Sequence, residues 1–121
     1  MNAPIKTLLV DDQASFREAM HILLELDSSV EVVAEAANGE EALKMTSEHM
    51  PQVVLMDLQM PVMCGAEATR RIRDRHPGVR VLVLSVFDQE KDVFEALRAG
   101  ASGYILKNTP MAQMMDAIRV V

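Results

Sequence analysis

Residues 53–61 read VVLMDLQMP, and this stretch holds the pattern from which the fold is inferred. Its first four residues are apolar without interruption, as in a strand that is buried on both faces of a sheet. Asp57 follows them directly, although burying an unpaired carboxylate is costly. We therefore expect Asp57 to have a specific purpose at the carboxyl end of this strand.

Four other apolar runs rich in Val, Leu and Ile resemble the one before Asp57, and segments with helical spacing of apolar residues separate them. The predicted strands are IKTLLV (5–10), VEVVAEA (30–36), QVVLM (52–56), VRVLVL (79–84) and SGYIL (102–106). Such alternation is typical of a parallel sheet covered by helices on both faces. With right-handed crossovers, we expect an α/β three-layer sandwich with strand order 2-1-3-4-5 and a crevice at the carboxyl ends of strands 1 and 3.

Several helix starts can be located from their capping residues. Ser15 with Glu18, and the segment 38–41, each fit a capping box. Thr109 and Pro110 suit the N-cap and the first position of the last helix, and Asp88 can cap the fourth helix.

Composition limits the classes of function. The chain has 121 residues, a net charge of −6 and one cysteine, Cys64. These values predict one globular domain in the reducing cytoplasm, and the apolar runs are too short to span a membrane. The acidic balance argues against nucleic-acid binding by this segment itself.

Polar side chains follow four of the five predicted strands. They are Asp11 and Asp12, Asp57, Ser85 and Lys107. Neighbouring carboxylates repel one another unless a cation compensates them, and oxygen ligands next to a phosphoryl group favour Mg²⁺. Taken singly, each residue has an ordinary explanation such as a helix cap or a solvated side chain. Their joint placement at one sheet edge instead favours Asp57 as a nucleophile, with Lys107 and Ser85 holding a phosphoryl group.

The segments LLVDDQ, VVLMDLQMPVMCG, VLVLS and GYILK resemble the motifs of the receiver domain of two-component response regulators, over essentially the whole chain. The resemblance implies a flavodoxin-like (βα)5 fold and a phospho-acceptor, Asp57, that catalyses its own phosphorylation and dephosphorylation and is not an enzyme for other substrates. Asp12, Asp57 and the Gln59 backbone carbonyl would bind Mg²⁺, and Asp11 would support it through water. Ser85 and Lys107 would contact the phosphoryl group, which a sensor histidine kinase donates.

The resemblance also implies a switch. Ser85 moves toward the phosphoryl group and Tyr104 turns inward, which alters the face made by helix 4, strand 5 and helix 5. We expect a homodimer to form on phosphorylation.

The stretch SVFDQEKDVFEALRAGASGYILKNTP resembles NarL/FixJ-type receivers, which control a C-terminal helix-turn-helix domain. We therefore expect residues 1–121 to be the receiver domain of a transcription regulator. It would contact DNA only through a domain that this chain lacks. A stand-alone receiver acting through protein contacts is the alternative.

Three positions depart from the family pattern. Asn108 stands where many receivers have proline, and Cys64 replaces an acidic or amide residue before Gly65. Val86 and Phe87 follow Ser85 where small or polar residues are common, which predicts slow loss of phosphate because apolar groups exclude water.

Two other classes share parts of this pattern. A haloacid-dehalogenase-type phosphatase needs a second Asp where this chain has Gln59, and its nucleophile follows the first strand. A flavodoxin-like flavin carrier needs a phosphate-binding loop after strand 1, where the acids of DDQASF would repel a phosphate.

Overall fold

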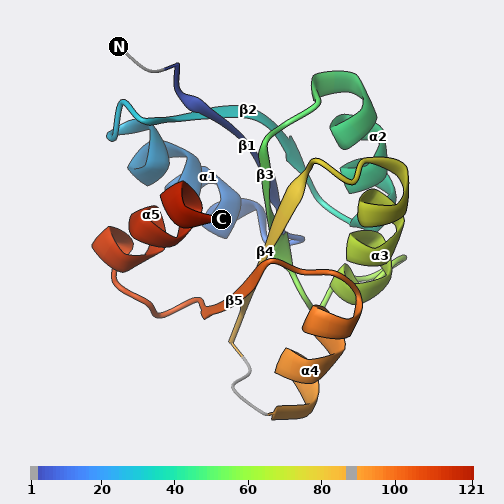
Figure 1. Ribbon diagram of the computed structural model, residues 1–121. Coiled ribbons are helices and arrows are strands. Elements are labelled where there is room, and N and C mark those ends of the chain that lie inside the picture. The colour runs from blue at the N-terminus through green and yellow to red at the C-terminus, as the bar shows by residue number, and fades with distance from the viewer. Residues whose placement is uncertain (1–2, 87–89) are drawn as a thin grey trace.

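The computed structural model describes residues 3–86 and 90–121, in which strands and helices alternate along the chain (Figure 1). In chain order they are β1 (Ile5–Val10), α1 (Ala14–Glu25), β2 (Val30–Ala36), α2 (Gly39–His49), β3 (Val53–Asp57), α3 (Gly65–Arg75), β4 (Arg80–Ser85), α4 (Glu90–Arg98), β5 (Gly103–Leu106) and α5 (Met111–Val120). The predicted helix cap at Asp88 and the predicted exclusion of water by Phe87 lie outside the described residues.

All five strands are parallel and lie in the order β2-β1-β3-β4-β5, as the sequence predicts. β3 and β4 extend one residue further than expected, because Asp57 pairs with Leu84 and Ser85 pairs with Leu106. Both polar residues are therefore the last members of buried strands. This register fixes their backbones at the carboxyl edge of the sheet.

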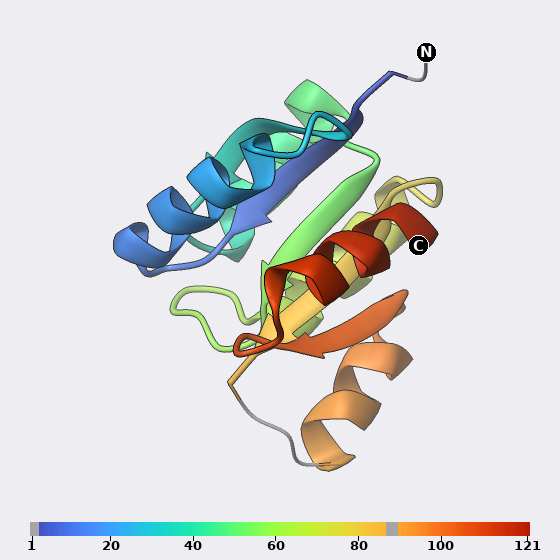
Figure 2. The same cartoon turned by 90° about the vertical axis from the view of Figure 1, so that its left-hand side faces the viewer.

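Helices cover both faces of the sheet, as expected for a three-layer sandwich. Figure 1 shows α2, α3 and α4 on one face and α1 and α5 on the other, and Figure 2 shows the latter two in front of the strands. Long apolar side chains pack beneath α1 and α5, among them Met20, Leu24, Met114, Met115 and Ile118. Smaller residues dominate beneath the other helices, among them Ala42, Ala66, Ala68, Ala96 and Ala99. The smaller residues allow α2, α3 and α4 to approach the strands closely.

The capping predictions had mixed outcomes. Asn38 caps α2, since its side chain accepts the backbone N–H of Glu41 at 2.9 Å, and Glu41 Oε1 accepts the N–H of Ala37 at 3.0 Å. The capping box predicted at Ser15 is wrong, because α1 already begins at Ala14. The Asp11 carboxylate accepts the N–H of Gln13 at 2.9 Å and so sets the turn before the helix.

The last helix begins one residue later than predicted. Pro110 is the residue before its first turn, with an extended ψ of 143°, and its carbonyl accepts the N–H groups of Gln113 and Met114. Over the described ranges every peptide bond is trans, including Lys107–Asn108. None of the helices in those ranges is long and apolar enough to cross a membrane.

Candidate functional site

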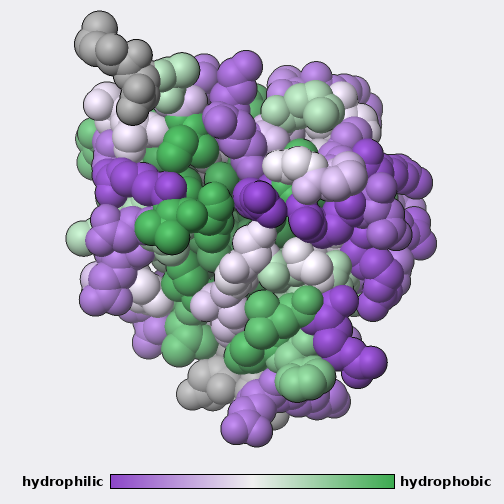
Figure 3. Space-filling model, in the orientation of Figure 1, coloured by the Kyte–Doolittle hydropathy of each residue, from purple (hydrophilic) through white to green (hydrophobic). Residues whose placement is uncertain are grey.

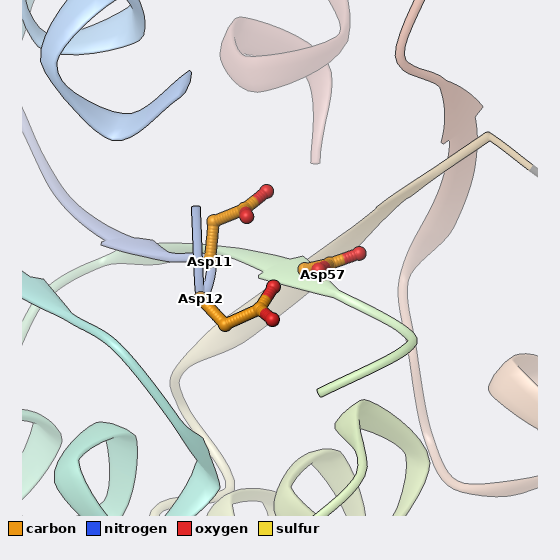
Figure 4. A group of neighbouring side chains, drawn as sticks. All are labelled: Asp11, Asp12 and Asp57. Carbon is orange, nitrogen blue, oxygen red and sulfur yellow. The ribbon is translucent and has the colours of Figure 1, made fainter. Parts of the chain in front are cut away.

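Three aspartates meet at the carboxyl edge of the sheet. Asp11 and Asp12 follow β1, and Asp57 ends the neighbouring strand β3 (Figure 4). One carboxylate oxygen from each lies within 4.8 Å of the others. Asp11 and Asp57 are buried, whereas Asp12 is exposed. The pattern of strand ends in the sequence predicted this meeting.

The Asp57 carboxylate lies in an unfavourable environment for negative charge. Its pKa is raised to about 6, first by burial and then by the charge of Asp11, with a smaller contribution from Asp12. The charge of Lys107 and the backbone N–H of Gln59 act in the opposite direction without cancelling the rise. The charged form of Asp57 is therefore destabilised in the folded chain, and an added cation would stabilise it.

Asp11 is held at each of its polar groups. Its N–H donates to the Ala36 carbonyl at 3.0 Å, and its carboxylate oxygens accept the Gln13 N–H at 2.9 Å and the Lys107 ammonium at 2.6 Å. Its own carbonyl accepts from Arg17 Nη1 at 2.6 Å. Both oxygens of this carboxylate are engaged, while Asp12 presents an exposed carboxylate to any incoming ligand.

Lys107 lies between the two buried acids. Its Nζ is 2.6 Å from Asp11 Oδ2 and 3.6 Å from Asp57 Oδ1, and its side chain is 13% exposed. The position follows from the sheet, because β5 ends at Leu106 and the Lys107 N–H donates to the Ser85 carbonyl at 2.9 Å. An ammonium beside a buried carboxylate can contact a group attached to that carboxylate.

The two predicted switch residues lie on adjacent strands. Ser85 is buried one residue beyond Leu84, the register partner of Asp57. Tyr104 pairs with Val83 and packs, partly buried, against the core beneath α2, α3 and α4. The fold therefore joins Tyr104 to the strand that ends in Ser85. Their movement on phosphorylation stays a prediction.

The segment between β3 and α3 is built tightly around Asp57. The Gly65 N–H donates to the Leu58 carbonyl at 2.9 Å, and a Cβ at Gly65 would lie 2.2 Å from the Asp57 carbonyl oxygen. Val62 has a φ of 70°, a region that β-branched residues rarely adopt. Cys64 precedes α3, is exposed and makes no side-chain cap, so its replacement of an acid or amide affects the helix start and not the acidic cluster.

The donors in this cluster suit a hard divalent cation. They are carboxylate oxygens, two of them buried, and Lys107 supplies one positive charge against three acids. Oxygen ligands of this kind bind Mg²⁺ or Ca²⁺ and not the softer metals that histidine and cysteine prefer. The residues present therefore fit such an ion.

A parallel sheet of order 2-1-3-4-5 with this acidic edge defines a receiver-type α/β domain. The chain matches the family model of the response regulator receiver domain over residues 7–119, and it belongs to that family. This membership excludes the phosphatase and flavin-carrier alternatives.

Two relatives by sequence are transcriptional or oxygen regulatory proteins. The chain is 41% identical to the transcriptional regulatory protein DegU of Brevibacillus brevis over 117 residues, which cover 97% of this chain and 50% of that protein. It is 44% identical to the oxygen regulatory protein NreC of Staphylococcus aureus over 118 residues, covering 97% of this chain and 54% of that protein. The chain thus spans about half the length of these relatives.

Solved structures agree with the sequence relatives. The receiver domain of the response regulator NarL from Mycobacterium tuberculosis superposes with a TM-score of 0.90 at 33% identity, covering 99% of this chain and 100% of that one. A LuxR-family response regulator from Aurantimonas sp. SI85-9A1 gives a TM-score of 0.91 at 37% identity, covering 96% and 83%. The predicted likeness to NarL-type receivers is confirmed.

Proposed function

We propose that this chain is the receiver domain of a LuxR-type transcription regulator in the cytoplasm. It accepts a phosphoryl group on Asp57 from a sensor histidine kinase and so controls the DNA-binding domain. The observation that carries the proposal is the environment of Asp57. A buried carboxylate of raised pKa ends β3, with the exposed Asp12 carboxylate and the Lys107 ammonium beside it. Family membership identifies a histidine kinase as the partner class.

The three acids would contact the cation in different ways. Asp12, Asp57 and the Gln59 backbone carbonyl would bind Mg²⁺, and Asp11, whose two oxygens are already hydrogen-bonded, would act through water. When bound, Mg²⁺ supplies charge that shields both the phosphoryl group and the attacking oxygen. Mg²⁺ is favoured over Ca²⁺ because few carboxylates are offered and a phosphoryl group must share the ion.

The transfer itself asks little of other residues. An oxygen of Asp57 forms the new O–P bond while the N–P bond of the donor phosphohistidine breaks, and its electron pair returns to the imidazole. Lys107, already 3.6 Å from Asp57 Oδ1, would donate to one phosphoryl oxygen, and the Ser85 hydroxyl would donate to another. This is positioning and charge stabilisation within one chain, and not catalysis on a separate substrate.

Phosphorylation would change the binding properties of the face made by α4, β5 and α5. Ser85 would move toward the phosphoryl group and Tyr104 would turn further inward, which changes this face between two states. Phe94 and Leu97 of α4 are 64% and 51% exposed, and Val120 of α5 is 84% exposed. Figure 3 shows apolar surface that crosses the C-terminal end of α5. Burial of such residues would drive homodimer formation and bring two DNA-binding domains together.

Intact mass spectrometry after incubation with acetyl phosphate and Mg²⁺ tests the proposal. We expect the native chain to gain one phosphoryl group and Asp57→Ala to gain none, with Asp116→Ala as an exposed-aspartate control that behaves like the native chain. No gain on the native chain, or equal gain on Asp57→Ala, would contradict it. The reading frame beyond Val121 separates a helix-turn-helix regulator from a stand-alone receiver.

A further inference from the structure

Two adjacent residues in the first turns of α1 contact different halves of the site. We propose that Phe16 and Arg17 are positioning residues, Arg17 for the cation-binding acids and Phe16 for the Lys107 ammonium. The inference rests on the proposed function, because it assigns these residues to the cation and phosphoryl groups of that same site. Each half would then be adjustable without the other.

Arg17 connects the acidic loop to β2. Its Nη1 donates to the Asp11 carbonyl at 2.6 Å, and its Nε donates to Glu35 Oε1 at 3.1 Å. The Arg17 side chain is only 18% exposed, so these bonds are shielded from water more than a surface ion pair is. The guanidinium thus fixes two points that lie far apart in the chain.

The carbonyl that Arg17 holds belongs to the peptide group joining Asp11 to Asp12. Fixing the plane of that group fixes where the Asp12 Cα lies, and so limits the directions that the Asp12 carboxylate can take. Asp12 is the exposed acid of the cluster and has the least support of its own. Arg17 would therefore pre-organise a cation ligand that it does not touch.

The far end of Arg17 is also anchored. Glu35 Oε2 lies 2.8 Å from His21 Nδ1, and His21 Nε2 lies 3.1 Å from Glu25 Oε1. The hydrogen bond with Glu35 is the main cause of the raised pKa of His21. Glu35 is thus held by two partners on α1, which restricts the rotamers available to Arg17.

Phe16 acts on the other half of the site. Its ring centroid lies 4.4 Å from Lys107 Nζ, and its side chain is partly buried against the core beneath α1. A ring face attracts an ammonium without accepting one of its conventional hydrogen bonds. Lys107 can therefore be held by the Asp11 carboxylate and the ring while an N–H stays available for a phosphoryl oxygen.

The test separates Mg²⁺ binding from binding of beryllofluoride, a phosphoryl mimic, by calorimetry on the native chain and its variants. Arg17→Gln should weaken Mg²⁺ binding about tenfold and change beryllofluoride affinity little at saturating Mg²⁺. Phe16→Leu should leave Mg²⁺ affinity unchanged and weaken beryllofluoride binding about fivefold, and Phe16→Tyr should restore it. A merely structural role would move both affinities together.

A matched control carries the same chemical change elsewhere. Arg71→Gln removes an exposed arginine that pairs with Glu67 on α3. This variant should bind Mg²⁺ and beryllofluoride like the native chain. Glu35→Gln tests the far end of Arg17 without touching the site, and should weaken Mg²⁺ binding in the same direction as Arg17→Gln.

The outcomes distinguish this inference from the proposed function. If the native chain binds neither Mg²⁺ nor beryllofluoride, both are wrong. If the native chain binds both, but Arg17→Gln keeps its Mg²⁺ affinity or Phe16→Leu loses both affinities equally, only the positioning roles are overturned.

Discussion

Two clusters of aspartates, each paired with one basic side chain, lie at opposite edges of the sheet, and their environments differ. At the carboxyl edge Asp11, Asp12 and Asp57 share Lys107, and two of the acids are buried. At the other edge Asp27 and Asp116 pair with Arg119, and all three are substantially exposed.

The pKa values of the two clusters move in opposite directions. Burial and neighbouring acids raise the pKa of Asp57 to about 6. Hydrogen bonds from the Ser29 hydroxyl and N–H, with help from Arg119, lower the pKa of Asp27. The exposed cluster is satisfied by its own partners, whereas the buried one gains from an added cation. On this difference we base the proposal that the cluster at Asp57 has a function and that the cluster at Asp27 has a structural role.

The largest effect should come from disturbing the backbone that holds Asp57. Gly65→Ala places a Cβ against the Asp57 carbonyl, and backbone cannot move aside cheaply, so we expect a loss of about 3 kcal/mol in the free energy of unfolding. Urea titration measures it. Gly78→Ala is the control, since a Cβ there meets nothing within 4 Å. Equal losses for both variants would show that the tight approach at Gly65 is unimportant.

Removing the charge of Asp57 should stabilise the metal-free chain. A group whose pKa is higher in the folded state than in the unfolded state stabilises the fold when the pH is below its unfolded pKa. That contribution is lost as the pH rises through its folded-state pKa. Asp57→Asn should therefore match the native chain near pH 3.5, diverge between about pH 4 and pH 6, and be more stable by about 2 kcal/mol at pH 7. Thermal or urea unfolding at several pH values measures this. A constant difference across that range would contradict the assigned cause.

Strain in the loop after Asp57 should give a smaller effect. Asn tolerates the positive φ found at Val62, so Val62→Asn should raise the free energy of unfolding by about 1 kcal/mol. Val120→Asn, at an exposed position of α5 with helical backbone, provides the comparison and should not stabilise. Stabilisation by both substitutions would remove the argument from backbone strain.

The smallest effect is expected at the exposed cluster. Asp27→Asn should lower the free energy of unfolding only slightly, and added salt should reduce the loss further, because exposed ion pairs contribute little. Phosphorylation of Asp57, followed by intact mass, should be unchanged. Reduced phosphorylation would mean that the two edges of the sheet are coupled.

Much of this site could be read from the sequence because its residues end strands. The apolar runs locate β1, β3 and β4, and parallel pairing then brings Asp11, Asp57 and Ser85 to one edge. The register could not be read to the residue, since Asp57 and Ser85 complete their strands instead of following them.

Contacts that depend on how α1 docks were not predictable. Phe16 belongs to the apolar stripe of α1, and its position over Lys107 joins residues from opposite ends of the chain. Arg17 has no signal in the sequence that links it to Glu35 or to the Asp11 carbonyl. The failed cap at Ser15 has a local origin instead, because the Asp11 carboxylate accepts the Gln13 N–H and α1 begins at Ala14.

The central claim is that burial and neighbouring acids raise the pKa of Asp57, and that a bound cation stabilises its charged form. Carbon-13 NMR titration of the aspartate carboxyl groups measures it directly, with Asp57→Asn used to assign the Asp57 resonance. We predict a pKa of about 6 for Asp57 without metal, and a clear fall when Mg²⁺ is added, while Asp27 stays below its ordinary value throughout. A pKa near 4 for Asp57 that Mg²⁺ leaves unchanged would contradict the account.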